Sequence, residues 1–259
     1  MTDYEAAILD VDGTIVRGEE LLPNVTDGLH ALEDAGIDRL LFSNNPTRGS
    51  DHYGETLEPY GIEVDPNAVL TSATVSAEYL ATTHPNERVY LVGSDRLVTI
   101  LEDAAVEVTD DPDAAEVVLG SFDKEFSYGT LWESLRALEG DVPFYGTDPD
   151  ATIPIDGGLI PGSGAIIAAM EAVADREADS ILGKPSSIAA ATAMNRLESD
   201  PERTLVVGDR LNTDIALGER AGMTTVLVRT GVTEQADLEA AAVQPDHVLD
   251  SLAEIETLL

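Results

Sequence analysis

The sequence has no cysteine and few basic residues, and each shortage excludes a class of protein. Its 259 residues include 14 Lys and Arg against 50 Asp and Glu, so the formal net charge is −36. Without cysteine there is no disulfide framework and no thiolate catalysis. A charge of this sign opposes binding to nucleic acid and to anionic membranes. We therefore expect neither as a partner.

Long apolar runs are also missing. No stretch approaches the roughly 20 apolar residues that a membrane-spanning helix needs. The first residues, Met1 to Glu5, are acidic and lack the basic start of a signal peptide. These features predict a soluble cytoplasmic protein.

The acidic residues are spread along the whole chain rather than gathered in a tail, and 43% of the residues are hydrophobic. Taken as a whole, this amino-acid composition resembles the salt-adapted, haloarchaeal-type composition of proteins from organisms that accumulate molar salt. In such salt the Debye length is only about 3 Å, so self-repulsion among the carboxylates is largely screened.

We therefore predict that the fold is weaker in low salt than in molar KCl. The melting temperature should be higher in molar KCl than in low-salt buffer. A melting curve that is the same in both would contradict this expectation.

Apolar runs alternate with segments of helical spacing in the first and last thirds of the chain, which predicts an α/β fold with a parallel sheet. The middle has its own α/β pattern. We expect one domain from residues 1–71 and 180–259, with a second inserted at 72–179. The expected strands are 6–9, 39–42, 89–92, 117–119, 180–182, 204–207, 224–228 and 247–249. The expected helices are 24–35, 49–60, 96–103, 128–138, 187–197, 212–221 and 234–241, followed by a closing helix.

Asp10 and Asp12 stand where the first apolar run, 6–9, ends in a glycine turn. Asp-x-Asp alone carries little information, because chance predicts roughly two to three such pairs in a chain with 26 aspartates, and three occur. The strand before this pair sets it apart, since ligands of open α/β sheets bind outside the carboxyl ends of the strands. An EF-hand calcium loop is excluded, because Ile15 and Leu21 occupy the positions that need Gly and Glu.

Polar residues follow other predicted strands in the same way. Ser43-Asn44-Asn45 follow the second, Lys184 lies in a Gly-Lys-Pro turn just after the strand at 180–182, and Asp209 and Asp214 follow the strand at 204–207. Each alone has an ordinary structural explanation as a turn, cap or surface residue. Lysine is nearly absent from this chain, however, so a lysine in that turn is a candidate site residue.

Taken together, these motifs resemble those of the haloacid dehalogenase (HAD) superfamily of aspartate-nucleophile phosphatases. The ordered set is Asp10-Val11-Asp12-Gly13-Thr14, Ser43-Asn44-Asn45, Gly183-Lys184-Pro185 and Gly208-Asp209 through Asp214. The inserted domain is similar to the cap of the NagD-like, type IIA branch, which includes 4-nitrophenylphosphatases and phosphoglycolate phosphatases. The resemblance implies a Rossmann-like core with an inserted α/β cap. One departure is Asp148 in the cap, where relatives often have Asn.

The resemblance also implies roles for these residues. Asp10 would attack phosphorus and form an aspartyl-phosphate, and Asp12 would act as general acid and base. Mg²⁺ would be bound by Asp10, Asp209 and the Asp12 carbonyl. Ser43, Asn44, Asn45 and Lys184 would bind substrate, the backbone of Asn44 contacting phosphoryl oxygens. Asp214, Gly13 and Thr14 would support the site.

The expected function is thus Mg²⁺-dependent hydrolysis of a small phosphate monoester, of sugar phosphate, phosphoglycolate or nucleotide type. The partner would be a small phosphorylated metabolite, and the protein a monomer or homodimer. One alternative is a non-catalytic phospho-receiver or metal-binding regulatory module, which also clusters aspartates with a lysine. Another is phosphonate cleavage through a Schiff base, for which Lys124 is the only lysine in the cap.

Overall fold

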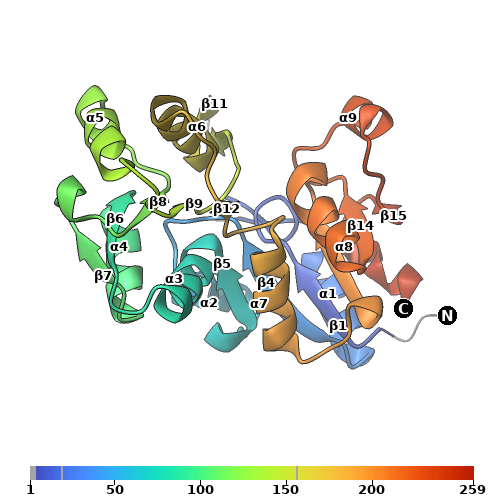
Figure 1. Ribbon diagram of the computed structural model, residues 1–259. Coiled ribbons are helices and arrows are strands. Elements are labelled where there is room, and N and C mark those ends of the chain that lie inside the picture. Colours follow the sequence, from blue (N-terminus) through green and yellow to red (C-terminus); the bar gives the residue numbers. More distant parts are fainter. Residues whose placement is uncertain (1–3, 19, 156) are drawn as a thin grey trace. The chain divides into compact units, whose positions relative to one another are not determined.

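The computed structural model describes residues 4–18, 20–155 and 157–259 (Figure 1). The chain forms two compact units. Unit 1 comprises the segment ending at Ser43 together with Ser50–Leu70 and Ala189–Leu259. Unit 2 comprises Asn44–Gly49 and Thr71–Ile188.

Unit 1 is built on a six-stranded sheet in the order β15-β14-β13-β1-β4-β5. The pairs from β15 to β4 are parallel, and β1 lies between β13 and β4. All four residues of β1 are buried, as expected for a central parallel strand covered on both faces. The strands are β1 (Ala6–Leu9), β4 (Asp38–Ser43), β5 (Val69–Thr71), β13 (Thr204–Gly208), β14 (Thr224–Val228) and β15 (His247–Leu249).

Helices pack on this sheet through apolar side chains. Leu29 and Leu32 of α1 and Leu57 of α2 join Leu9 and Val207 in one buried cluster. α8 lies against β13 and β14. The α-helices are α1 (Val25–Asp34), α2 (Ser50–Leu57), α7 (Ser187–Leu197), α8 (Ala216–Ala221) and α9 (Gln235–Ala240). The 3-10 helices are η1 (Glu58–Tyr60), η2 (Pro66–Ala68), η4 (Pro201–Arg203) and η6 (Leu252–Leu258). The element η5 (Leu211–Ile215) is a π-helical turn. A short strand β2 (Val16–Arg17) pairs with β3 (Glu20–Leu21).

Unit 2 contains a five-stranded parallel sheet in the order β12-β9-β8-β6-β7. α3 and α4 pack on one face and α5 and α6 on the other (Figure 1). The strands are β6 (Arg88–Val92), β7 (Glu107–Thr109), β8 (Val117–Gly120), β9 (Phe144–Gly146) and β12 (Ser180–Ile181), with a separate antiparallel hairpin of β10 (Thr152–Ile155) and β11 (Gly158–Pro161). The helices are α3 (Ser72–Thr83), α4 (Asp95–Asp103), η3 (Pro112–Ala114), α5 (Tyr128–Ala137) and α6 (Ser163–Ala174).

The strand before Lys184 belongs to unit 2, which differs from the sequence-based expectation that the segment from residue 180 onward continues the first domain. Ser180 and Ile181 pair with Tyr145 and Gly146 of β9. The contact continues beyond the strand, because the Gly183 N–H donates to the Thr147 carbonyl oxygen at 2.8 Å. Backbone pairing with β9 therefore fixes this segment.

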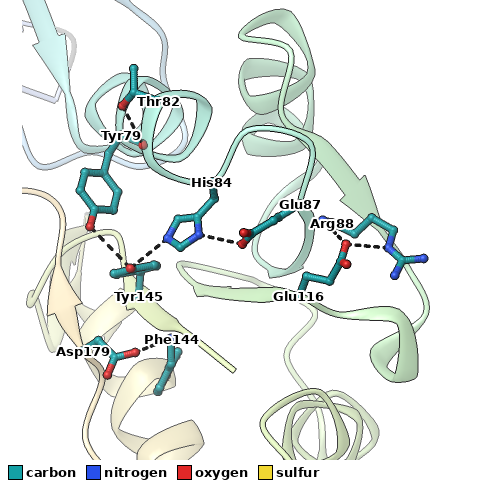
Figure 2. A network of polar contacts seen from close by, with 9 residues as sticks. All are labelled: Tyr79, Thr82, His84, Glu87, Arg88, Glu116, Phe144, Tyr145 and Asp179. Atoms are coloured by element: carbon teal, nitrogen blue, oxygen red, sulfur yellow. Dashed lines mark hydrogen bonds and ion pairs between the residues drawn. The ribbon is translucent and has the colours of Figure 1, made fainter. Parts of the chain in front are cut away.

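A polar network links α3 to β9 inside unit 2 (Figure 2). The His84 ring contacts Glu87 through Nδ1 at 2.8 Å and the Tyr145 hydroxyl through Nε2 at 3.0 Å. The Tyr79 hydroxyl donates to the Tyr145 hydroxyl at 3.5 Å. Burial, and then the hydrogen bond with Tyr79, raise the pKa of Tyr145 above its ordinary range, so this phenol stays neutral. The network fixes the strand that leads into Thr147 and Asp148.

None of the helices within the described ranges has both the length and the apolar character needed to cross a membrane.

Candidate active site

Asp10 lies at the carboxyl end of β1, and its side chain is buried. The Thr14 hydroxyl donates to Asp10 Oδ2 at 3.3 Å across the turn that follows. Gly13 adopts φ = 99°, a left-handed conformation that favours glycine. The Gly-Thr pair thus folds the chain back beside the carboxylate, and the predicted supporting residues Gly13 and Thr14 lie next to Asp10.

Three carboxylates gather at this edge of the sheet. One oxygen each of Asp10, Asp209 and Asp214 lies within 4.8 Å of the other two. All three side chains are buried. Like charges this close repel one another unless a cation or protons compensate them. Hard oxygen donors of this kind are the ligands of Mg²⁺, so the residues fit a divalent metal ion.

Asp12 lies outside this carboxylate cluster. Its side chain is exposed, and its Oδ2 accepts a hydrogen bond from the Ser43 hydroxyl at 3.2 Å. Ser43 ends β4 and is buried. Two carboxylates two residues apart therefore occupy different surroundings, one facing the acidic cluster and the other accessible to water. This is the arrangement that lets two acids take different roles.

The loop after β14 encloses Asp209, and no motif in the sequence predicts this contact. The Val232 N–H donates to Asp209 Oδ2 at 2.7 Å, and the Thr233 hydroxyl donates to the Asp209 carbonyl oxygen at 2.5 Å. The Thr230 hydroxyl donates to the Gly13 carbonyl oxygen at 2.6 Å. A Cβ atom at Gly231 would lie 1.8 Å from Asp209 Oδ2, so this position has no room for a side chain.

This loop orients the Asp209 carboxylate through the backbone N–H of Val232 and through the missing side chain at Gly231. Such contacts leave no charged or nucleophilic residue as a signal in the sequence. The one available signal is the position of Gly231, shortly after the predicted strand at 224–228.

Asp214 is held by the turn that follows β13. The Arg210 N–H donates to Asp214 Oδ2 at 3.1 Å. The chain between these two residues forms the π-helical turn η5, where the sequence predicts the beginning of a regular helix at 212. The wider turn brings Asp214 back toward Asp209, into the carboxylate cluster.

The remaining predicted residues lie in unit 2. The side chain of Asn44 is hydrogen-bonded to the backbone of Lys184, whose own side chain is buried. Asn45 turns instead toward Thr47, whose N–H and hydroxyl donate to Asn45 Oδ1 at 2.9 and 2.8 Å. Within the units, the structure thus brings Asp10 together with Asp209 and Asp214, Asp12 with Ser43, and Asn44 with Lys184.

Asp148 follows β9 and is a buried acid in the same unit. Burial, and then the nearby Asp150 carboxylate, raise the pKa of Asp148 to about 7. The Thr147 hydroxyl donates to Asp148 Oδ2 at 2.9 Å, and the Asp150 N–H donates to Oδ1 at 3.3 Å. A carboxyl group in such surroundings is largely protonated below neutral pH.

Comparisons with known proteins agree with these motifs. A family model described as haloacid dehalogenase-like hydrolase matches residues 7–107, and one described as HAD-hydrolase-like matches residues 181–255. An acid sugar phosphatase of Staphylococcus epidermidis is 31% identical over 97% of this chain and 96% of its own length. A dihydroxyacetone phosphatase of Corynebacterium glutamicum is 30% identical over 98% of this chain and 92% of its own.

Solved structures show the same likeness over the whole chain. A p-nitrophenyl phosphatase from Archaeoglobus fulgidus has a TM-score of 0.93 and 32% identity, covering 99% of this chain and 100% of that one. NagD from Escherichia coli K-12 has a TM-score of 0.87 and 27% identity, covering 98% and 99%. The chain therefore belongs to the haloacid dehalogenase-like hydrolases, as a NagD-like phosphatase that hydrolyses phosphoric monoesters.

Proposed function

We propose that the protein hydrolyses a small sugar-phosphate-type monoester in a Mg²⁺-dependent reaction through a phosphoryl group on Asp10. The observation that carries this proposal is the carboxylate cluster of Asp10, Asp209 and Asp214 at the end of the central strand. A phosphate monoester repels nucleophiles, so positioning and charge compensation must supply most of the catalysis. A cluster that can hold a cation beside a buried carboxylate meets that requirement.

Asp10 and Asp209, with the Asp12 backbone carbonyl, would hold the metal ion, which would offset negative charge on the phosphoryl group. In the first step a carboxylate oxygen of Asp10 attacks phosphorus, and the bond between phosphorus and the ester oxygen breaks. The Asp12 carboxyl gives its proton to the departing alkoxide, so the alcohol leaves neutral.

In the second step Asp12, now ionised, takes a proton from a water molecule. The water oxygen attacks phosphorus, the bond from phosphorus to Asp10 breaks, and inorganic phosphate is released. Asp10 is then a carboxylate again, and Asp12 is again protonated. The exposure of Asp12 suits this role, because in each cycle the group must give a proton to the leaving alcohol and then take one from a water molecule.

Ser43 and Lys184 would bind the phosphoryl oxygens, with Asn44 and Asn45 contributing to the substrate site and Asp214 supporting the metal ligands. A buried ammonium matters in a chain of net charge −36, because the protein as a whole repels an anionic substrate. The attraction of the anionic substrate must then come from groups at the site itself.

Of the three substrate classes expected from the sequence, the sugar phosphates receive support from the names of the relatives, an acid sugar phosphatase and a dihydroxyacetone phosphatase. Phosphoglycolate and nucleoside monophosphates are the competing classes.

A panel of phosphate monoesters tests this proposal. The protein should hydrolyse triose and hexose phosphates with Mg²⁺ in molar KCl, and EDTA should abolish turnover until Mg²⁺ is restored. Each substrate should be assayed by phosphate release, with phosphoglycolate and nucleoside monophosphates in the same panel. A preference for either of those two would overturn the substrate class, and full activity in EDTA would overturn the metal dependence.

A further inference from the structure

Two hydrogen bonds join the Asn44 side chain to the main chain of Lys184. Asn44 Oδ1 accepts from the Lys184 N–H at 2.9 Å, and Asn44 Nδ2 donates to the Lys184 carbonyl oxygen at 3.0 Å. One side-chain amide therefore satisfies both backbone groups of a residue 140 positions away in the sequence. Two bonds of opposite direction fix the orientation of that backbone as well as its position.

Asn44 is itself anchored on its other side. The Ser72 hydroxyl, at the start of α3, donates to the Asn44 carbonyl oxygen at 2.8 Å. Asn44 thus connects the beginning of α3 to the turn that carries Lys184, and both ends of the connection lie in unit 2.

The packing around this connection is tight. A Cβ atom at Gly183 would lie 2.8 Å from Asn44 Oδ1 and 2.6 Å from the Thr147 carbonyl oxygen. The turn before Lys184 is therefore confined between the Asn44 amide and the end of β9. Residue 183 must be glycine for the amide to approach this closely.

Lys184 needs such an anchor because of its burial. Its side chain is only 1% exposed, whereas Lys124, the other lysine of the chain, is exposed. The buried side chain has little room to readjust, so a displacement of its backbone also displaces the ammonium, and a misplacement of about 1 Å can cost a catalytic site roughly 10²-fold in rate.

We propose that Asn44 is a positioning residue, whose side-chain amide fixes the main chain of Lys184 and thereby sets the place of its ammonium. This differs from the role expected from the sequence, in which the Asn44 backbone contacts phosphate. The use of the ammonium to bind phosphoryl oxygens rests on the proposed function, but the anchoring of Lys184 does not.

Chemical labelling of the two lysines tests the anchoring without any assay of activity. The full chain is treated with an amine-reactive acylating reagent in molar KCl, and modification of Lys124 and Lys184 is followed by mass spectrometry. Lys184 should be protected in the native protein. In Asn44→Ala it should react at least about tenfold faster, because losing two hydrogen bonds shifts a local opening equilibrium by that order. The rate at Lys124 should not change.

Asn44→Asp is the second variant, and it keeps the size of the side chain and one acceptor. Its other oxygen cannot donate and would face the Lys184 carbonyl oxygen, so Lys184 should again lose protection. Asn67→Ala, which removes an exposed amide in unit 1, should leave both lysine rates unchanged. Native protection of Lys184 in folded Asn44→Ala or Asn44→Asp would overturn the proposal.

Kinetics separate positioning from a general loss of structure. Asn44→Ala should raise KM and the inhibition constant for inorganic phosphate, and adding it to Lys184→Ala should cost little more. Losses that simply add in the double variant would contradict an action through Lys184. If no variant, nor the native chain, hydrolyses any phosphate ester, the labelling result still decides the anchoring.

Discussion

Replacing Asp10 by asparagine should reduce hydrolysis of an aryl phosphate by a factor on the order of 10⁴ to 10⁶, the range found when one residue of a catalytic triad is removed. The amide has nearly the same shape as the carboxylate but is a far weaker nucleophile. It also withdraws one negative charge from the cluster with Asp209 and Asp214. The measurement is kcat for 4-nitrophenyl phosphate with Mg²⁺ in molar KCl.

Asp111→Asn is the matched control, because Asp111 also begins an Asp-x-Asp pair but is exposed and distant in sequence. Its side chain accepts a hydrogen bond from the Asp113 N–H at 3.1 Å, which asparagine can also accept. This variant should keep native turnover. A phosphorylated intermediate should be trapped by acid quenching of the native chain and be missing in Asp10→Asn. Activity of Asp10→Asn within tenfold of native would exclude Asp10 as the nucleophile.

Asp148→Asn should stabilise the protein above neutral pH and change its pH dependence. The pKa of Asp148 is about 7 in the folded protein and about 3.9 in an unfolded chain. The folded state therefore binds this proton more tightly than the unfolded state does. The stability contributed by the protonated group is fully present below pH 4 and is lost as pH rises through 7. At 1.36 kcal/mol for each pKa unit, the loss approaches roughly 4 kcal/mol.

Asparagine stays neutral at every pH, so the stability of Asp148→Asn relative to the native chain should grow from pH 5 to pH 8. Denaturant unfolding in molar KCl at both values gives this difference. Asp113→Asn, which alters an exposed aspartate, should show no such trend. A difference between Asp148→Asn and the native chain that is equal at pH 5 and pH 8 would show that Asp148 is ionised in the fold at both.

The elements that the sequence predicts best are the central strands of unit 1. β1, β13 and β14 are apolar runs that end at glycine or at polar residues, and the expected bounds differ from the observed ones by at most one residue. α3 and α6 are missed because their periodicity is weak. α3 is rich in Ser, Thr and Ala, and α6 carries apolar residues around most of its circumference.

The residues of the candidate site also differ in whether the sequence predicts them. Asp10, Asp209 and Asp214 can be found because charged side chains follow apolar strands, and the structure gathers them in one cluster. The loop of Gly231 and Val232 cannot be found in this way, because it acts through backbone groups. The hydrogen bonds between the Asn44 side chain and Lys184 cannot be predicted either, because they are made to the main chain of a residue 140 positions away.

The division of the chain between Ser43 and Asn44 has a consequence for any attempt to shorten the protein. The cut falls inside Ser43-Asn44-Asn45, and both lysines of the sequence, Lys124 and Lys184, belong to unit 2. A protein trimmed to unit 1 would keep the cluster of Asp10, Asp209 and Asp214 but would contain no lysine side chain at all. Unit 2 therefore cannot be removed without also removing both lysines, which are the only ammonium side chains in this acidic chain.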